Sequence, residues 1–336
     1  MMPRPLQAFQ GNILLTGASG FVGGYFIRRL EEDGLDLGKV HVLTRSGRKP
    51  PFDGLQTVAG DVGDREQVRR IIAEISPVAV VHLAAVALPA HARKDPDLAW
   101  RVNLDSVRFT ADAILAEAPN CRLIFSGSAE AYGASFNDYT GPIPETAALQ
   151  PTSTYGATKA AADILLGQMA WQGLKAVRFR AFNHTGPGQS PDYVVASFAG
   201  QVARIEAGLQ PPVLRVGNLN AARDFLDVRD VVRAYSLALA ADLPFASAPV
   251  FNIASGQART IASILDRLLS LSQADIAVEV DPARLRPSEI AVASGASEAI
   301  SDALGWVPTI DFDKVLVDTL DASREVAGAG RTSEPE

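Results

Sequence analysis

Cysteine is almost absent from the chain, which has only Cys121 among 336 residues. One cysteine excludes an internal disulfide and leaves no companion thiol for a structural zinc site. The few histidines do not supply a metal motif, because His82 is expected in a strand and His91 in a loop, without ligand partners at metal spacing. The sequence therefore predicts no metal, and a reducing cytoplasm as the location.

Long apolar runs and runs of like charge are also missing. No window reaches the roughly 18 apolar residues of a membrane span, and the N-terminal stretch MMPRPLQAFQ lacks the apolar segment of a signal peptide. The net charge is −7, without a run of five like charges. These absences argue against a membrane and against nucleic acid as partners, and they favour a soluble protein.

Apolar residues are plentiful, at 47% of the chain. A chain of this length can bury about three quarters of its unfolded surface, in one large domain or two joined ones. Short apolar runs alternate with amphipathic stretches, which predicts an α/β fold with a doubly wound parallel sheet. Expected strands cover residues 12–16, 40–44, 57–59, 78–83, 121–127 and 176–180. Expected helices cover residues 21–30, 65–75, 96–118 and the segment around Tyr155.

The composition of the chain changes at Asn183, where Pro and Gly cluster in NHTGPGQSP. The helices and strands expected after this point are shorter. We expect a Rossmann-like dinucleotide-binding domain at 11–182 plus 224–254, and a smaller α/β substrate-binding domain at 183–223 plus 255–326. The ends, 1–10 and 327–336, are expected to be disordered, because AGAGRTSEPE is small and polar.

A glycine-rich turn, Gly17 to Gly23, stands between the first expected strand and the first expected helix. Strand, glycine turn and helix form the context of a dinucleotide site, where glycines let pyrophosphate approach a helix N-terminus. The spacing is G-x-x-G-x-x-G rather than the commoner G-x-G-x-x-G, and a plain strand-to-helix turn is the alternative interpretation.

Tyr155 and Lys159 are four residues apart on an expected helix, so they share one face. A nearby cation stabilises a phenolate and moves the tyrosine pKa, ordinarily about 10, toward working pH. This pair is suited to general acid or base chemistry beside a bound dinucleotide. The alternative is a core tyrosine with a surface lysine one turn on.

Eight segments in order resemble the extended short-chain dehydrogenase/reductases, a family of nucleotide-sugar-modifying enzymes, over residues 12 to about 326. They are TGASGFVGG, GDVGD with Asp61, HLAA with Leu83 to Ala85, Val102-Asn103, FSGSAEAYG, Tyr155-x-x-x-Lys159, RAFNHTGPGQ and RDFLDVRDVV. Within the family, NHTGPGQSPDYVVASFAGQVARIEAG, VGNLNAARDFLDVRDVVRAY and LRPSE are most similar to reductases that make GDP-D-rhamnose from GDP-4-keto-6-deoxy-D-mannose. GDP-mannose 4,6-dehydratases are closely related to these reductases and share the same order of sequence segments.

This resemblance implies NADPH-dependent reduction of the 4-keto group of a nucleotide-linked 4-keto-6-deoxy hexose, with a GDP-linked sugar favoured. The alternatives are a GDP-mannose 4,6-dehydratase, or another epimerase or dehydratase that recycles its own nicotinamide. A non-catalytic NAD(P)-binding regulatory protein is disfavoured, because Ser128, Tyr155 and Lys159 are all intact. The base, the sugar and the configuration at carbon 4 (rhamnose or 6-deoxytalose) stay open.

The resemblance assigns catalytic roles to four residues. Ser128 would bond the reacting oxygen of the sugar, Tyr155 would exchange a proton with it, and Lys159 would hold the nicotinamide ribose and tune the tyrosine. The alternative interpretation of Ser128 is a serine that belongs to a turn and has no catalytic role. Glu130 matches the dehydratase glutamate that takes the proton from carbon 5, but it would equally suit a carboxylate that binds a substrate hydroxyl or faces water.

NADP(H) is favoured as cofactor and NAD(H) is possible, because residues 44–49, TRSGRK, offer three cations and no carboxylate where NAD enzymes place an acid. Arg45 is the expected contact of the 2′-phosphate; solvated surface charge is the alternative. Asp61 would accept from the adenine amino group, and Asn103 would support the network or merely bond backbone. The expected cofactor set is Gly17, Ser19, Gly20, Phe21, Val22, Gly23, Arg45, Asp61, Val62, Leu83, Ala84, Ala85, Asn103, Tyr155 and Lys159.

The substrate set implied by the resemblance adds four residues to Ser128 and Glu130. Arg223 and Arg286 would grip the diphosphate, for which guanidinium is suited. Glu289 would bind the nucleotide ribose and Asn183 the sugar. His184 is expected to be structural or to lie near the cofactor.

A homodimer is expected, because the family commonly pairs two helices per subunit, here residues 96–118 and 155–171. Both segments carry more apolar residues than one buried face needs. These include Leu98, Val102, Phe109, Ile164, Leu165 and Met169.

Overall fold

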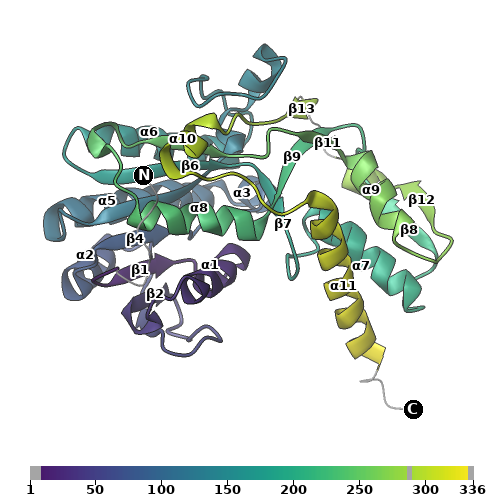
Figure 1. Ribbon diagram of the computed structural model, residues 1–336, viewed down its shortest axis with the longest axis horizontal. Helices are drawn as coiled ribbons and strands as arrows, with labels where there is room; N and C mark the ends of the chain where they lie inside the picture. The colour runs from purple at the N-terminus through teal and green to yellow at the C-terminus, as the bar shows by residue number, and fades with distance from the viewer. Residues whose placement is uncertain (1–8, 286–289, 332–336) are drawn as a thin grey trace.

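Within residues 9–285 and 290–331, which the computed structural model describes, seven parallel strands form one sheet (Figure 1). In spatial order they are β10 (Val250–Ile253), β6 (Lys175–Ala181), β5 (Arg122–Ser128), β4 (Ala79–His82), β1 (Ile13–Thr16), β2 (Val40–Thr44) and β3 (Gln56–Ala59). The chain order reverses between β1 and β4, where such sheets bind ligands beyond the carboxyl ends of the strands. The expected doubly wound α/β fold is confirmed.

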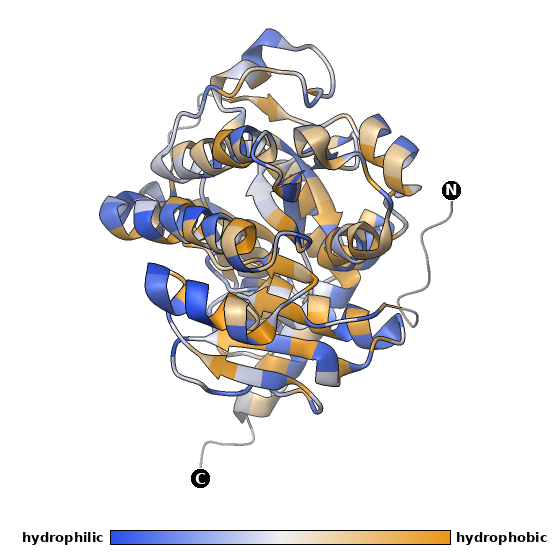
Figure 2. Ribbon diagram, turned by 90° about the vertical axis from the view of Figure 1, so that its left-hand side faces the viewer, coloured by the Kyte–Doolittle hydropathy of each residue, from blue (hydrophilic) through white to orange (hydrophobic). Residues whose placement is uncertain are grey.

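Two apolar cores lie on opposite faces of this sheet. Side chains alternate along a strand, so Ile13 and Leu15 join one core while Leu14 joins the other. The first core includes residues of α1 (Phe21–Glu32) and α8 (Val228–Ala240). The second includes residues of α2 (Arg65–Ile75), α5 (Ser106–Glu117) and α6 (Thr154–Ala170). Figure 2 shows apolar residues concentrated in the central strands.

The helix expected over residues 96–118 is divided by a π-helical turn. α4 (Pro96–Trp100) passes into η3 (Arg101–Asp105), and α5 begins at Ser106. Such turns hold an extra residue and frequently occur at functional sites. Here the turn contains Asn103, which is fully buried. Apolar spacing does not reveal this interruption.

Smaller sheets and three helices form the second part of the molecule, to the right in Figure 1. β7 (Asn183–Thr185), β9 (Ala222–Asp227), β11 (Ala258–Thr260) and β13 (Val292–Ala293) make one sheet, and β8 (Val213–Val216) pairs with β12 (Ala277–Val280). A third core joins this part through α7 (Val194–Glu206), α9 (Ile261–Ser270) and α11 (Phe312–Arg331). The remaining helical elements are η2 (Leu37–Lys39), α3 (Pro89–Lys94), η4 (Ala129–Ala131), η5 (Ala134–Asp138), η6 (Phe245–Ser247), η7 (Pro282–Arg284) and α10 (Glu298–Leu304).

The structure corrects the expected boundaries at three places. Position 224 lies inside β9, so the boundary expected there cuts a strand of the smaller sheet. Ile300 and Trp306 pack into the first core, although 255–326 was expected to be separate. The disorder expected at 327–331 is wrong, because α11 packs on α7 and continues to Arg331. Residues 1–8 and 332–336 lie outside the described residues.

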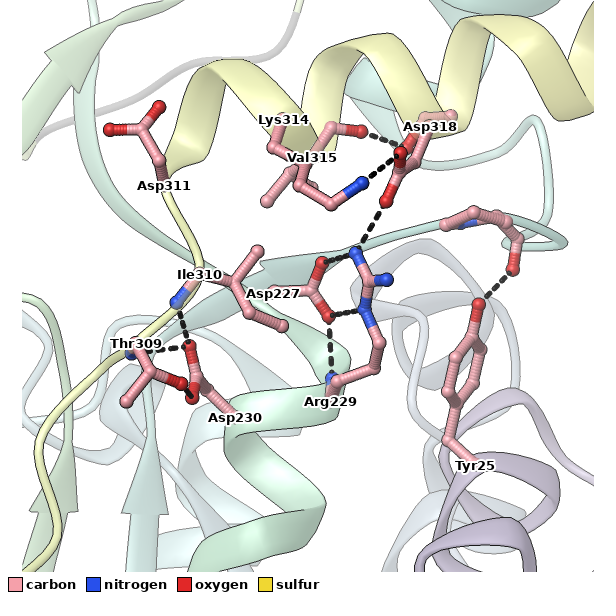
Figure 3. Close-up of polar contacts among 12 residues, drawn as sticks. Tyr25, Asp227, Arg229, Asp230, Thr309, Ile310, Asp311, Lys314, Val315 and Asp318 are labelled. Carbon is pink, nitrogen blue, oxygen red and sulfur yellow. Dashed lines mark hydrogen bonds and ion pairs between the residues drawn. The ribbon is translucent and has the colours of Figure 1, made fainter.

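Polar contacts join the two parts where α8 begins (Figure 3). Asp227 is buried and accepts from the Arg229 guanidinium at 2.9 and 2.6 Å, and the same guanidinium contacts Asp318 of α11 at 2.7 Å. On the adjoining helix α1, the Tyr25 hydroxyl donates to the Pro187 carbonyl at 2.8 Å. These contacts fix α11 and the loop after β7 against the large sheet. Among the described helices, none has the length and apolar character needed to cross a membrane.

Candidate active site

The glycine turn lies directly against the end of β4. Gly17 has a φ of +74°, and a Cβ there would lie 2.7 Å from the Ala84 nitrogen. A Cβ at Gly23 would lie 2.3 Å from the Gly17 carbonyl oxygen. Gly20 caps α1 without a side-chain bond, so the first N–H groups of the helix face outward from a turn of minimal bulk. This turn fits the pyrophosphate of a dinucleotide.

The residues expected to meet the adenosine half lie after β2 and β3. Arg45, Arg48 and Lys49 are exposed, and in the described part of the chain no carboxylate pairs with their side chains. Asp61 is also exposed, and its Oδ1 accepts from the Gly63 nitrogen at 2.8 Å. The cations that follow β2 therefore remain available to an anionic group.

Asn103 supports the loop after β4 instead of facing the cofactor groove. Its amide donates to the Thr158 hydroxyl at 3.0 Å and to the Val86 carbonyl at 3.2 Å, and its oxygen accepts from the Val86 nitrogen at 2.7 Å. The side chain is fully buried. The two bonds to Val86 are those of a buried amide that bonds backbone, and through Thr158 Asn103 holds that loop against α6.

The expected catalytic residues meet at the carboxyl end of β5. Ser128 ends this strand, and the Tyr155 phenol, from the first turn of α6, lies close enough for the Ser128 hydroxyl to influence its pKa. One helical turn further, Lys159 is buried and donates from Nζ to the Ser126 carbonyl at 2.8 Å. The Ser128 hydroxyl also accepts from the Glu130 nitrogen at 3.2 Å.

The electrostatics of this group favour a protonated tyrosine beside a charged lysine. Burial raises the pKa of Tyr155 above its ordinary value, and the neighbouring Ser128 hydroxyl opposes part of that rise. Burial lowers the pKa of Lys159 to about 8. Near neutral pH the phenol is therefore ready to donate a proton, and the ammonium beside it can stabilise the resulting anion.

Glu130 and Arg223 act on each other across the space between the two parts of the molecule. The Glu130 side chain is exposed to solvent, yet surrounding protein raises its pKa by desolvation while Arg223 opposes the rise. Arg223 comes from β9, and its guanidinium donates to the main-chain oxygens of Ala222 at 2.8 Å and Ile290 at 3.0 Å. A carboxyl such as that of Glu130, which solvent can reach but whose pKa is raised by the surrounding protein, is typical of a ligand-binding site.

The other substrate residues are only partly placed. Asn183 begins β7, is exposed, and follows Ala181, which pairs with Ser128 in the sheet. The His184 ring lies 3.0 Å from the Phe182 carbonyl, and burial lowers its pKa. Arg286 and Glu289 lie outside the described residues.

Tyr193 is a site residue that the sequence did not indicate. It caps α7, is partly buried, and would raise the pKa of Tyr155 further if it were ionised, so the two phenols are neighbours. The sequence segment that contains Tyr193 contributes only to the resemblance to the reductases. No local motif marks Tyr193, because its approach to Tyr155 depends on how α7 lies against the large sheet.

Comparisons with known proteins add three similarities. Residues 14–319 match the family model described as GDP-mannose 4,6 dehydratase. The chain is 33% identical to GDP-6-deoxy-D-mannose reductase of Pseudomonas aeruginosa over 241 residues, covering 71% of this chain and 78% of the relative. It is 28% identical to UDP-glucose 4-epimerase of Corynebacterium glutamicum, covering 88% and 90%.

A solved structure agrees with the fold. RMD from Pseudomonas aeruginosa, complexed with NADPH, superposes with a TM-score of 0.80 at 28% identity, covering 94% of this chain and 100% of that one. The family-model match over residues 14–319 spans both parts of the molecule.

Proposed function

The chain belongs to the GDP-mannose 4,6 dehydratase family of extended short-chain dehydrogenase/reductases, and from this premise we propose that it reduces GDP-4-keto-6-deoxy-D-mannose to GDP-D-rhamnose with NADPH. Its relatives are nucleotide-sugar reductases, dehydratases and epimerases. The observation that carries the choice of reductase is the 33% identity to GDP-6-deoxy-D-mannose reductase.

The residues of the site provide the proton donor, the hydrogen-bond donor and the cation that reduction of a ketone requires from the protein. NADPH, when bound, supplies the hydride. Tyr155 is held in its protonated form and donates a proton to the oxygen on carbon 4, while the Ser128 hydroxyl bonds the same oxygen and fixes its direction. The Lys159 ammonium stabilises the phenolate that remains. Reduction then needs no further acid or base.

The groove along the glycine turn suits NADPH, with NADH as a possible substitute. Gly17 and Gly23 allow the pyrophosphate to approach α1, and Ser19 to Val22 supply backbone donors. Arg45, with no carboxylate at its side in the described chain, would bind the 2′-phosphate. NADPH is also the ligand named for the Pseudomonas aeruginosa structure.

A dehydratase is the second candidate, and Glu130 is the observation that favours it. Its carboxyl is accessible, adjoins Ser128, and has a raised pKa, which suits a base that removes the proton from carbon 5. In the proposed reductase the same carboxylate would bind a sugar hydroxyl. Dehydration also requires departure of the hydroxyl on carbon 6, whereas reduction does not.

The assay that tests this function offers GDP-4-keto-6-deoxy-D-mannose with NADPH. We expect one NADPH consumed for each product formed, and NMR of the product should show rhamnose. A 6-deoxytalose product would keep the reductase but reverse the face of hydride delivery. Turnover of a nucleotide sugar without added cofactor would instead indicate an epimerase or dehydratase with retained nicotinamide.

We propose that the active form is a homodimer joined through two segments, residues 96–118 (α4 to α5) and 155–171 (α6 and its C-cap). Two large apolar side chains of the second segment are exposed, Ile164 at 61% and Trp171, the C-cap of α6, at 86%. Trp100 of α4 is also exposed. A second copy of this face would cover all three side chains.

A further inference from the structure

Arg180, on β6, connects the two segments that carry the catalytic residues. The side chain is buried, and Nε and Nη2 donate to the two oxygens of Asp163 at 2.9 and 3.0 Å. Nη1 donates to the Tyr132 hydroxyl at 3.0 Å and to the Glu145 carbonyl at 2.9 Å. Because a guanidinium is planar and rigid, these bonds fix the relative directions of their acceptors.

Asp163 connects Arg180 to α6. It follows Lys159 by four residues and Tyr155 by eight, so the three side chains lie along one face of the helix. Asp163 is buried and also accepts from Arg178 Nη1 at 2.9 Å. Two guanidinium groups on β6 therefore fix the rotation of α6 and its position along its axis.

Tyr132 connects Arg180 to the turn that contains Glu130. It follows η4 and is fully buried, and its hydroxyl donates to Asn252 Oδ1 at 2.7 Å while accepting from Arg180. The Arg180 guanidinium also lies over the Tyr132 ring, 4.9 Å from its centre. The turn is thus held at one end by Ser128 in β5 and at the other by Tyr132.

The two segments also touch directly. A Cβ at Gly156 of α6 would lie 2.5 Å from the Glu130 carbonyl oxygen, so the helix and the turn are packed backbone to backbone. The Ser128 hydroxyl and the Tyr155 phenol, which come from the same two segments, are neighbours on the side of the site. We propose that Arg180 is a positioning residue that, through Asp163 and Tyr132, sets the separation of Ser128 and Tyr155. Its kinetic consequence rests on the proposed function.

Tyr132→Phe tests the proposal with little loss of packing, because it removes the hydroxyl that Arg180 contacts, together with its bond to Asn252, and keeps the ring. A misplacement of about 1 Å can cost on the order of 100-fold in rate, and for this smaller change we expect kcat to fall about tenfold. The KM for NADPH should stay within about twofold, since the cofactor turn is untouched. Unchanged kcat in Tyr132→Phe would overturn the proposal.

A double-substitution cycle distinguishes positioning from general damage. If Tyr132 acts through Tyr155, adding Tyr132→Phe to Tyr155→Phe should cost less than about twofold more in kcat. Full additivity of the two losses would overturn the proposal. Arg233→Lys is the matched control, because Arg233, which is partly exposed, donates to the buried Asp230 at 2.8 Å in another ion pair, on α8. An equal fall in kcat in that control would likewise contradict a specific role.

A structural readout keeps this inference separate from the proposed function. If wild type turns over no keto sugar, the proposed function fails, and crystal structures of wild type and Tyr132→Phe decide the inference. A wider separation of the Ser128 and Tyr155 hydroxyls in the variant supports it, and an unchanged separation overturns it. Arg180→Lys, which cannot bond Asp163 through two nitrogens, provides a second variant if Tyr132→Phe does not fold.

Discussion

Lys159 Nζ and the Ser126 carbonyl oxygen are 2.8 Å apart, which holds the lysine against the strand that ends at Ser128. The contact accounts for one donor of the ammonium. Two others remain for the tyrosine or for a ribose hydroxyl. The lysine is buried, and this burial makes its protonation depend on pH within the working range.

The rate of reduction should fall as pH rises through about 8, the lowered pKa of Lys159. Below that value the lysine is charged and Tyr155, whose pKa is raised, keeps its proton. Above it the ammonium is lost, and the phenolate left by proton donation loses its stabilising charge. The measurement is kcat/KM against pH. A flat profile up to about pH 10 would contradict a role for the lysine charge.

Tyr155→Phe should lower kcat by roughly 10² to 10⁴, the range for general acid catalysis. In the proposed mechanism the phenol donates the proton, and the substitution removes only its hydroxyl, so NADPH affinity from a fluorescence titration should change little. Tyr139→Phe is the control, because Tyr139 is 40% exposed. Wild-type kcat in Tyr155→Phe would remove the phenol from the mechanism.

Arg45→Asp should move cofactor preference from NADPH toward NADH by at least about tenfold, or about 1.4 kcal/mol. The change replaces a cation suited to phosphate by a carboxylate suited to a ribose hydroxyl. Preference is measured as the ratio of kcat/KM for the two cofactors. Arg70→Asp, the same charge change on the exposed side of α2, should leave the ratio unaltered. Equal ratios in both variants would make Arg45 ordinary surface charge.

Ile164→Asp should convert the dimer to a monomer at micromolar concentration, because it places a carboxylate in an apolar contact. Sedimentation velocity measures the state of association. Val326→Asp on α11 is the control, since Val326 is also exposed but lies on another face. A wild-type monomer would remove the proposed interface altogether.

Much of the large sheet could be predicted because its signals are local. The apolar run at residues 12–16 and the amphipathic stretch at 65–75 correspond to β1 and α2, and the four-residue spacing places Tyr155 and Lys159 on one helix face. Parallel strands then bring Ser128 to the same edge as the glycine turn. The fold thus follows from patterns within a few residues, whereas the roles expected of Ser128, Tyr155 and Lys159 also depend on the family resemblance.

The remaining features depend on packing between distant segments. The π turn around Asn103 forms where a buried amide meets Val86 and Thr158. The helix to Arg331 persists because α11 lies on α7, although its last residues are small and polar. Arg180 begins the family segment RAFNHTGPGQ, but only the fold shows that its donors meet Asp163 and Tyr132.

The most direct measurement for the reductase assignment gives wild type and Glu130→Gln two substrates: GDP-4-keto-6-deoxy-D-mannose with NADPH, and GDP-mannose with NADP⁺. The Gln variant keeps the size and hydrogen bonding of Glu130 but cannot act as a base. We expect both proteins to reduce the keto sugar, with the variant slower by less than about tenfold, and neither to make keto product from GDP-mannose. Rapid formation of the 4-keto product from GDP-mannose by wild type, abolished in Glu130→Gln, would contradict the account and make the chain a dehydratase.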